Sequence, residues 1–309
     1  MTIEILQTHK LLDTCEKALA ERYTVHKLHE QSDKAAWLAE SGTRIRAVAG
    51  GNVDAALLDK LPKLEIIANF GVGYDTIDTK AAKARNVRVT NTPDVLNDAV
   101  AETALALMIG LARKLPHADR YIREGKWEGG NFPFVQELRG KTVGILGLGR
   151  IGKEIAARAQ AFKMRVVYHG RHRQPTEPHV YYESLEDMAR YSDWLVLVAP
   201  GGKETEGIVS RAVLEALGPD GYLVNVGRGS LVDEPAMIDL LQSGQLGGAG
   251  LDVFADEPRV PQSLRDLDNV VLTPHYASAT QTTRDAMGAL VVKNLEKHFA
   301  GEPLISAVV

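Results

Sequence analysis

The chain has 309 residues, more than one domain usually holds, so we expect two domains. Its composition, 45% hydrophobic and 25% charged, is that of an ordinary globular protein, and a net charge of −4 gives no indication of a nucleic-acid partner. The single cysteine, Cys15, excludes an internal disulfide framework and favours a reducing, cytoplasmic setting. We interpret Cys15 as a core-facing thiol on an early helix, without a catalytic role.

The N-terminal residues MTIEILQTHK lack the basic region and apolar stretch of a signal peptide. The longest apolar run, at 103–112, lies between Glu102 and Arg113. It is about half of the roughly 20 residues needed to cross a bilayer. We therefore expect a buried helix there and no membrane partner.

Short apolar strands alternate with helical stretches in the first part of the chain. Strands are predicted at 3–6, 23–28, 45–49, 65–70 and 87–90, and the helical stretches between them include 75–85. A long helical segment follows from about 96 to 125. Buried strands that alternate with helices predict a parallel sheet.

The same alternation restarts after the long helix. Strands are predicted at 142–147, 164–169, 194–199, 222–226, 248–254 and 269–273, and a final helix at 284–299. The simplest fold is α/β, with two doubly wound parallel sheets joined by the long helix. Active sites in such folds lie outside the carboxyl ends of the strands, where the strand order reverses.

A glycine-rich loop, GLGRIG, follows the strand at 142–147. Gly147 would permit the tight turn, Gly149 the approach of a pyrophosphate, and Gly152 the close packing of the next helix. The N–H groups at the start of that helix favour phosphate charge. Because the loop joins a strand to a helix, we interpret it as a dinucleotide site rather than a simple turn.

The second strand of such a unit usually ends in an acidic residue, which binds the ribose 2′-hydroxyl. This chain has Gly170 there, followed by Arg171 and Arg173. Gly170 leaves room, and the two guanidinium groups can bind a 2′-phosphate. We predict NADP(H) as the preferred cofactor, with NAD(H) as the second choice. A solvated basic loop is the alternative interpretation.

Three polar residues lie just beyond the carboxyl ends of three predicted strands. Arg228 follows 222–226, Glu257 follows 248–254, and His275 follows 269–273. A single polar residue in such a loop would mean little. Three of complementary chemistry, in the half that carries the glycine-rich loop, indicate an active site.

The ordered set of motifs resembles the D-isomer-specific 2-hydroxyacid dehydrogenase family. The motifs are GLGRIG at 147–152, NVGRGSLVDEPAMIDLL at 225–241, GAGLDVFADEP at 248–258 and LTPHYASAT at 272–280, and FGVGYDTID at 70–78 is similar to the family's substrate loop. The resemblance covers essentially the whole chain and is strongest to the glyoxylate/hydroxypyruvate reductases. It implies reduction of small 2-oxo acids, such as glyoxylate and hydroxypyruvate, to D-2-hydroxy acids.

The resemblance also implies discontinuous domains. Residues 1–98 and 283–309 would form a flavodoxin-like substrate domain, and residues 99–282 a Rossmann domain that binds NAD(P). The active site would lie in the cleft between the two domains.

The family resemblance implies a role for each of the three polar residues. Arg228 would bind the substrate carboxylate and polarise the 2-oxo group. His275 would be the general acid in reduction and the base in the reverse reaction, with Glu257 holding its other ring nitrogen. The hydride would come from the nicotinamide.

Further contacts follow from the family pattern. The backbone N–H groups of Val72 and Gly73 would bind the substrate carboxylate, and Asp252 would bind the nicotinamide carboxamide. The resemblance assigns the remaining cofactor contacts to Thr103, Gly147, Leu148, Gly149, Arg150, Ile151, Pro200, Thr205, Val226 and Gly227. It implies no metal site.

Two features depart from the family pattern or stand out within it. Tyr276 and Ala277 replace the small aliphatic residue and glycine that often follow the catalytic histidine. The loop 126–138 carries Trp127, Phe132 and Phe134, and in related reductases an aromatic from this region reaches the neighbouring subunit's site. We expect a homodimer, with the long helix 96–125 at its interface.

Two kinds of alternative function remain. One is another D-2-hydroxyacid dehydrogenase, of the short phosphoglycerate dehydrogenase or 2-ketogluconate reductase type. Formate dehydrogenases are disfavoured because they carry Gln where this chain has Glu257. The other is a dinucleotide-sensing module similar to the C-terminal-binding-protein corepressors, which share the fold and the Arg, Glu and His.

Overall fold

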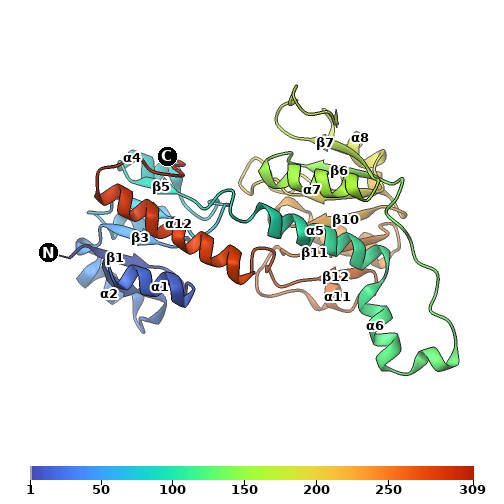
Figure 1. The fold of residues 1–309 in the computed structure, drawn as a ribbon, viewed down its shortest axis with the longest axis horizontal. Helices are drawn as coiled ribbons and strands as arrows, with labels where there is room; N and C mark the ends of the chain where they lie inside the picture. Colours follow the sequence, from blue (N-terminus) through green and yellow to red (C-terminus); the bar gives the residue numbers. More distant parts are fainter. Residues whose placement is uncertain (1) are drawn as a thin grey trace. The chain divides into compact units, whose positions relative to one another are not determined.

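The computed structural model describes residues 2–309. The described chain forms two compact units, each with its own parallel sheet (Figure 1). The first unit contains the residues up to Leu96 together with Ser278–Val309, and the second contains Asn97–Ala277. The predicted α/β class with two doubly wound sheets is confirmed.

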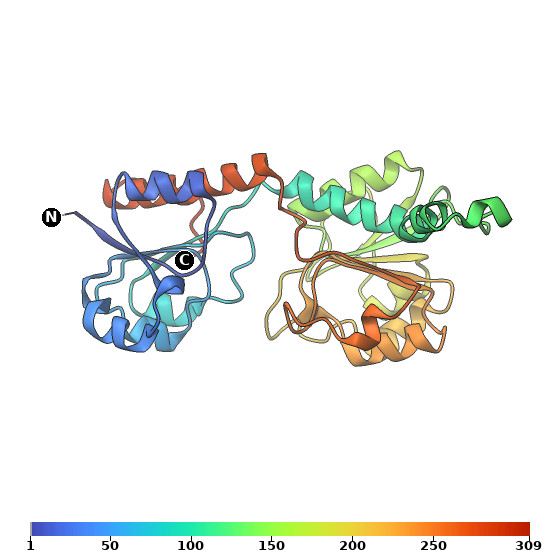
Figure 2. The ribbon, with the colours of Figure 1, turned by 90° about the horizontal axis from the view of Figure 1, so that it is seen from below.

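The first unit has a five-stranded parallel sheet with helices on both faces. Its strand order is β2 (Thr24–Lys27), β1 (Glu4–Gln7), β3 (Ala47–Ala49), β4 (Ile66–Ala68) and β5 (Arg88–Thr90). Figure 2 shows α1 (Asp13–Ala20) and α12 (Gln281–Phe299) on one face. The other face carries α2 (Lys34–Ser41), α3 (Ala55–Asp59) and α4 (Thr79–Ala84).

Alternation along each strand explains the two helical layers. In β1, Ile5 packs with the residues of α1 and α12, whereas Leu6 packs with those of α2 and α3. Both side chains are fully buried. Successive side chains point to opposite faces of a strand, so an unbroken apolar strand needs cover on both sides.

The second unit has a seven-stranded parallel sheet. Its strand order is β12 (Val270–Leu272), β11 (Gly248–Leu251), β10 (Tyr222–Asn225), β9 (Trp194–Leu197), β6 (Thr142–Leu146), β7 (Arg165–His169) and β8 (Val180–Tyr181). One face is covered by α5 (Asn97–Ala112) and α7 (Arg150–Ala161), and the other by α8 (Leu185–Arg190), α9 (Arg211–Leu217) and α10 (Glu234–Gln242). The short α11 (Gln262–Arg265) precedes β12.

The strand order reverses once in each sheet. In the first unit the reversal lies between β1 and β3, and in the second between β6 and β9. Loops at the carboxyl ends of these strands are where doubly wound sheets bind ligands.

The prediction of one long helix from 96 to 125 is wrong. The segment breaks into α5 and α6 (Leu115–Arg123), because Lys114 adopts a left-handed conformation with φ of 50°. Pro116 then occupies the first turn of α6, a position that suits a residue without an N–H group.

Two further predictions differ from the structure. The helical stretch predicted at 75–85 begins only at Thr79, after Asp78 caps the helix by accepting from the N–H of Ala81. The short strand β8 was not predicted, because two residues are too few to show a pattern. Cys15 is buried on α1, as predicted, and burial together with nearby Glu16 raises the pKa of its thiol to about 11.

Within residues 2–309, no helix is long and apolar enough to cross a membrane. The same residues contain no group of three or more His, Cys, Asp or Glu side chains arranged to hold a metal ion.

Candidate active site

The glycine-rich loop has the geometry of a phosphate-binding turn. Gly147 has a φ of 100°, and a Cβ there would lie 2.9 Å from the Ala199 backbone. A Cβ on Gly152 would lie 2.2 Å from the carbonyl oxygen of Gly147, so only glycine lets α7 approach β6 this closely. A Cβ on Gly149 would meet nothing within 4 Å, which leaves open space beside the start of α7. The three glycines therefore fit a bound pyrophosphate.

The start of α7 offers unsatisfied donors at this open space. The backbone N–H groups of Ile151 and Gly152 have no acceptor among the described residues. Donors of this kind at the positive end of a twelve-residue helix favour an anion. Leu148 is buried below the loop, and its carbonyl is engaged by Gln174.

The loop that follows β7 is tied to the glycine-rich loop. Gln174 Nε2 donates to the Leu148 carbonyl at 2.7 Å, and the Gln174 N–H donates to the hydroxyl of buried Tyr168 at 2.7 Å. Tyr181 donates to the Gly170 carbonyl at 3.1 Å. The loop is thus fixed at both ends, while the side chains of Arg171 and Arg173 are exposed and make no ion pair within the described chain.

Glu257 and His275 form a hydrogen-bonded pair. Glu257 Oε2 lies 2.6 Å from His275 Nδ1, and Glu257 Oε1 accepts from the Phe254 N–H at 3.0 Å. Burial opposes ionisation of this carboxyl, but the bonds from His275 and Phe254 and the Arg228 charge outweigh it and hold the pKa of Glu257 below its usual value. His275 Nε2 has no partner among residues 2–309, so this nitrogen is available to a ligand.

The backbone of His275 is itself unusual. Its φ of 51° places it in the left-handed region, which a residue other than glycine rarely adopts. Such conformations persist where the surroundings enforce them, and they cluster at functional sites.

Asp252 enforces the conformation of the loop around His275. Its carboxylate accepts from the Thr273 hydroxyl at 2.7 Å and from the N–H groups of Tyr276 and Ala277 at 3.0 Å each. Asp252 is only 1% exposed. Its first role is therefore to position the histidine loop, and only Oδ2, which accepts one bond, retains capacity for a carboxamide.

A close backbone contact brings Arg228 beside Glu257. A Cβ on Gly229 would lie 1.9 Å from the Phe254 carbonyl carbon, so glycine lets the loop after β10 press against the loop after β11. Asn225 closes the turn from the other side: its Nδ2 donates to the Arg228 carbonyl and its Oδ1 accepts from the Gly227 N–H. The structure thus brings the three predicted catalytic residues together in the second unit.

The other predicted cofactor residues occupy loops or helices of the same unit. Thr103 is buried on α5 and donates to the Ala99 carbonyl, whereas Thr205 donates to the carbonyl of exposed Pro200 in the loop after β9. Val226 is buried, and a Cβ on Gly227 would lie 3.0 Å from the Ala199 carbonyl oxygen. Gly147 and Gly227 thus both pack against Ala199, which places the ends of β6, β9 and β10 side by side.

Val72 and Gly73 lie in the first unit, in the loop after β4. Three successive carbonyls of this loop accept side-chain hydrogen bonds: Asn69 Nδ2 donates to those of Gly71 and Gly73, and Asn91 Nδ2 donates to that of Val72. The N–H groups of Val72 and Gly73 have no acceptor among the described residues. The loop therefore presents two adjacent donors, which suit a carboxylate.

The residues that hold these loops were missed by sequence reasoning. Asn69 and Asn91 stand directly after β4 and β5, and a polar residue at the end of a buried strand was a usable signal. Gln174 carried no such signal, because its role depends on a contact with Leu148, 26 residues away.

Comparisons with known proteins identify the family to which the chain belongs. A family model described as the NAD binding domain of D-isomer specific 2-hydroxyacid dehydrogenases matches residues 105–277. A hydroxyphenylpyruvate reductase of Plectranthus scutellarioides is 46% identical over 95% of each chain. A glyoxylate/hydroxypyruvate reductase A of Arabidopsis thaliana is 45% identical over 100% of this chain and 99% of its own.

A solved structure with the same fold is also similar to this chain. It is an NADPH-dependent glyoxylate/hydroxypyruvate reductase from Sinorhizobium meliloti in complex with NADP and malonate, with 43% identity, a TM-score of 0.96, and coverage of 100% of this chain and 97% of that one.

The chain belongs to the D-isomer specific 2-hydroxyacid dehydrogenase family. It is an NAD(P)-dependent oxidoreductase, and the predicted binding of a nicotinamide dinucleotide is confirmed. This result favours the enzyme over the corepressor-like module considered from the sequence.

Proposed function

We propose that this chain is an NADPH-preferring reductase of small 2-oxo acids, such as glyoxylate and hydroxypyruvate, and that its products are D-2-hydroxy acids. The observation that carries the proposal is the Glu257–His275 pair, which leaves Nε2 of His275 available near the Arg228 charge. The similar reductases of Arabidopsis thaliana and Sinorhizobium meliloti support the substrate class.

The catalytic trio fits this chemistry. Bound NADPH supplies the hydride that reduces the 2-oxo carbon. His275 Nε2 donates a proton to the oxygen of that carbon, which gains negative charge as the hydride arrives. Glu257 accepts from Nδ1, which holds the ring in place and leaves Nε2 for the substrate. Arg228 binds the carboxylate through its planar guanidinium.

The loop after β7 supports a preference for NADPH. Gly170 provides no acid to repel a 2′-phosphate, and a Cβ there would meet nothing within 4 Å. Arg171 and Arg173 are exposed beside it, on a loop that Gln174 ties to the pyrophosphate site. Two permanently charged donors on a fixed loop suit a phosphate better than a hydroxyl.

We also propose domain roles and a location. Residues 1–98 with 283–309 would bind the substrate carboxylate through Val72 and Gly73, and residues 99–282 would bind the cofactor. The cytoplasmic location stays a prediction from the sequence.

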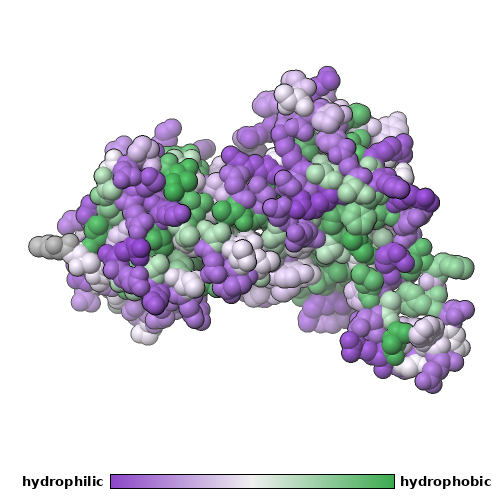
Figure 3. All heavy atoms as spheres, in the orientation of Figure 1, coloured by the Kyte–Doolittle hydropathy of each residue, from purple (hydrophilic) through white to green (hydrophobic). Residues whose placement is uncertain are grey.

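A homodimer is the third element of the proposal. The arm formed by residues 115–138 exposes four large apolar side chains: Leu115, Ile122, Trp127 and Phe134. Figure 3 shows hydrophobic surface over α6 and the segment that follows it. Phe132 packs on Tyr121, with ring centroids 5.4 Å apart, so Trp127 and Phe134 are the better candidates to contact a partner.

A substrate panel tests the proposed function. Initial rates would be measured with glyoxylate, hydroxypyruvate and 2-ketogluconate, each with NADPH and with NADH, and the configuration of each product determined. We expect reduction of the first two acids, a higher kcat/KM with NADPH, and D products. Absence of reduction with every acid would rule out the proposal.

A further inference from the structure

The first unit contains a basic pocket that the catalytic trio does not use. It is open, has a volume of about 400 Å³, and lies at the carboxyl edge of the five-stranded sheet. Its wall includes Lys10, Leu11, Leu12, Phe70, Thr280 and Arg284, and no acidic side chain lines it. The loop after β1, which borders the reversal of strand order in this sheet, contributes three of these residues.

Two cationic side chains line the pocket. Arg284 stands over the ring of Phe70, with its Cζ 5.6 Å from the centroid. Lys10 is exposed and makes no ion pair with any residue from 2 to 309. Burial and the charges of His29 and Arg284 lower the pKa of neighbouring His9, which is consistent with a positive potential in this region.

The start of α12 adds further donors beside the pocket. Thr280 caps this helix of 19 residues by accepting from the N–H of Thr283. The N–H groups of Gln281 and Thr282 have no acceptor in the described chain. Both point from the positive end of the helix, so they reinforce the two side-chain cations.

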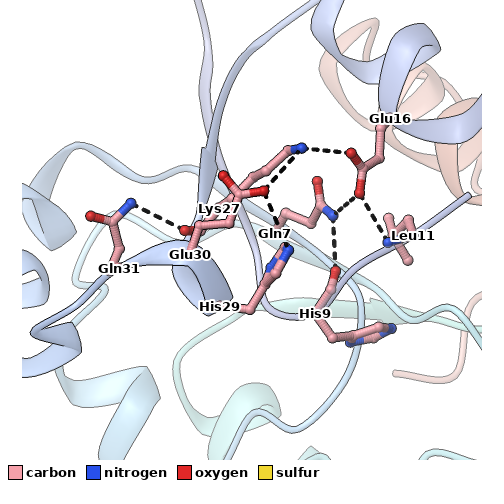
Figure 4. Close-up of polar contacts among 8 residues, drawn as sticks. All are labelled: Gln7, His9, Leu11, Glu16, Lys27, His29, Glu30 and Gln31. Carbon is pink, nitrogen blue, oxygen red and sulfur yellow. Dashed lines mark hydrogen bonds and ion pairs between the residues drawn. The ribbon is translucent and has the colours of Figure 1, made fainter. Parts of the chain in front are cut away.

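A partly buried polar network holds the loop that carries Lys10 (Figure 4). Glu16 accepts from Gln7 Nε2 at 2.7 Å and from the Leu11 N–H at 3.1 Å, and it pairs with Lys27. Gln7 Nε2 also donates to the His9 carbonyl at 2.9 Å. The backbone is thus held on both sides of Lys10, so little ordering is needed when an anion binds.

The pocket adjoins the proposed carboxylate loop. Phe70 lines it, and Val72 is two residues further along the chain, a span of at most about 7 Å. Leu11, Leu12 and Phe70 give the wall an apolar part that suits a short carbon chain. A ligand held at Val72 by one carboxylate could therefore place a second anionic group between Lys10 and Arg284.

We propose that this pocket binds the anionic tail of an extended 2-oxo acid, a second carboxylate or a phosphate carried beyond the oxo group. The inference rests on the proposed function, since Val72 and Gly73 must hold the first carboxylate. Lys10 and Arg284 would then set a preference for 2-oxo acids with two anionic ends.

Matched substrates test the subsite. Hydroxypyruvate and its 3-phosphate ester differ only in the tail phosphate, and pyruvate and oxaloacetate differ only in the tail carboxylate. For each pair, the measured quantity is kcat/KM for the acid with the anionic tail divided by kcat/KM for the acid without it. In Lys10→Met, Arg284→Met and the double variant, we expect this ratio to fall at least about ten-fold for one pair or for both. The pair whose ratio falls shows whether the pocket binds a phosphate or a carboxylate. Lys17→Met removes an exposed cation of α1 outside the pocket and should leave both ratios unchanged.

Charge restoration separates binding from a folding defect. Arg284→Lys should recover most of the ratio, because it keeps the cation. Unchanged ratios in the double variant, or a wild-type enzyme that reduces hydroxypyruvate and pyruvate but neither tailed acid, would overturn the inference. A wild-type enzyme that reduces no 2-oxo acid at all would instead overturn the proposed function.

Discussion

Asn69 is the residue that most directly shapes the proposed carboxylate loop. Its amide bridges two carbonyls while it is only 4% exposed. In Asn69→Asp an acceptor replaces the donor and faces both carbonyls. The substitution removes both hydrogen bonds to the loop and should weaken substrate binding. We therefore expect KM for glyoxylate to rise by about ten-fold or more, with a smaller change in kcat.

Asn91→Asp provides the graded comparison. Asn91 contributes one bond to the loop, to the Val72 carbonyl, so its substitution should raise KM less than that of Asn69. Steady-state kinetics with saturating NADPH would measure both effects. An unchanged KM in Asn69→Asp would show that the loop does not bind the substrate.

Substitution of Arg171 and Arg173 tests whether these two side chains determine the choice of cofactor. The double substitution to Ala should raise KM for NADPH about ten- to a hundred-fold, because charge-assisted bonds to the 2′-phosphate are lost. KM for NADH should change little. Arg139→Ala removes an exposed arginine elsewhere in the second unit and serves as control. Equal increases for both cofactors would identify the loop as ordinary surface.

At the scale of single elements, Glu16 anchors α1 to the loop after β1. Burial opposes its ionisation, but bonds from Lys27, Gln7 and the Leu11 N–H outweigh burial and hold the pKa of Glu16 below its usual value. A carboxyl with a lowered pKa stabilises the fold above its unfolded pKa, about 4.3 for Glu, and loses this contribution as pH falls through the folded value.

Glu16→Gln should therefore lower the free energy of unfolding by about 1–3 kcal/mol at pH 7. The difference from wild type should shrink below about pH 4, as the wild-type carboxyl becomes protonated. Chemical denaturation of both proteins between about pH 4 and pH 7 would measure this difference in the free energy of unfolding. Glu21→Gln, at an exposed surface pair, should cost less than about 1 kcal/mol. A difference for Glu16→Gln that is constant with pH would contradict the account.

The sequence predicted those elements whose pattern is local. All strands except β8 were predicted, because each is a short apolar run between polar loops. The spacing of Gly147, Gly149 and Gly152, between a predicted strand and a predicted helix, marked the phosphate loop. The end of α5 was not predicted, since residues 96–125 keep a helical pattern through Lys114. The roles of Asn69 and Asp252 depend on contacts with other parts of their loops or with other loops. A local sequence pattern does not predict such contacts.

At the scale of the whole molecule, the arm predicts self-association. No residue of α6 is buried, and the arm exposes Leu115, Ile122, Trp127 and Phe134 together. A group of exposed apolar side chains is typical of a protein–protein interface. Sedimentation analysis at micromolar concentration should give a dimer. Ile122→Asp combined with Trp127→Ala should shift it toward monomer, whereas Val180→Ser, an exposed position outside the arm, should not. A wild-type monomer would contradict the dimer proposal.

The central claim is that His275, held by Glu257, supplies the proton for reduction of a 2-oxo acid. The direct measurement is turnover of glyoxylate with NADPH in His275→Gln, together with the Kd for NADPH from fluorescence titration. We predict a fall in kcat of about a hundred- to ten-thousand-fold, with the Kd within a few-fold of wild type. Retention of wild-type turnover, or loss of NADPH binding in step with activity, would contradict it.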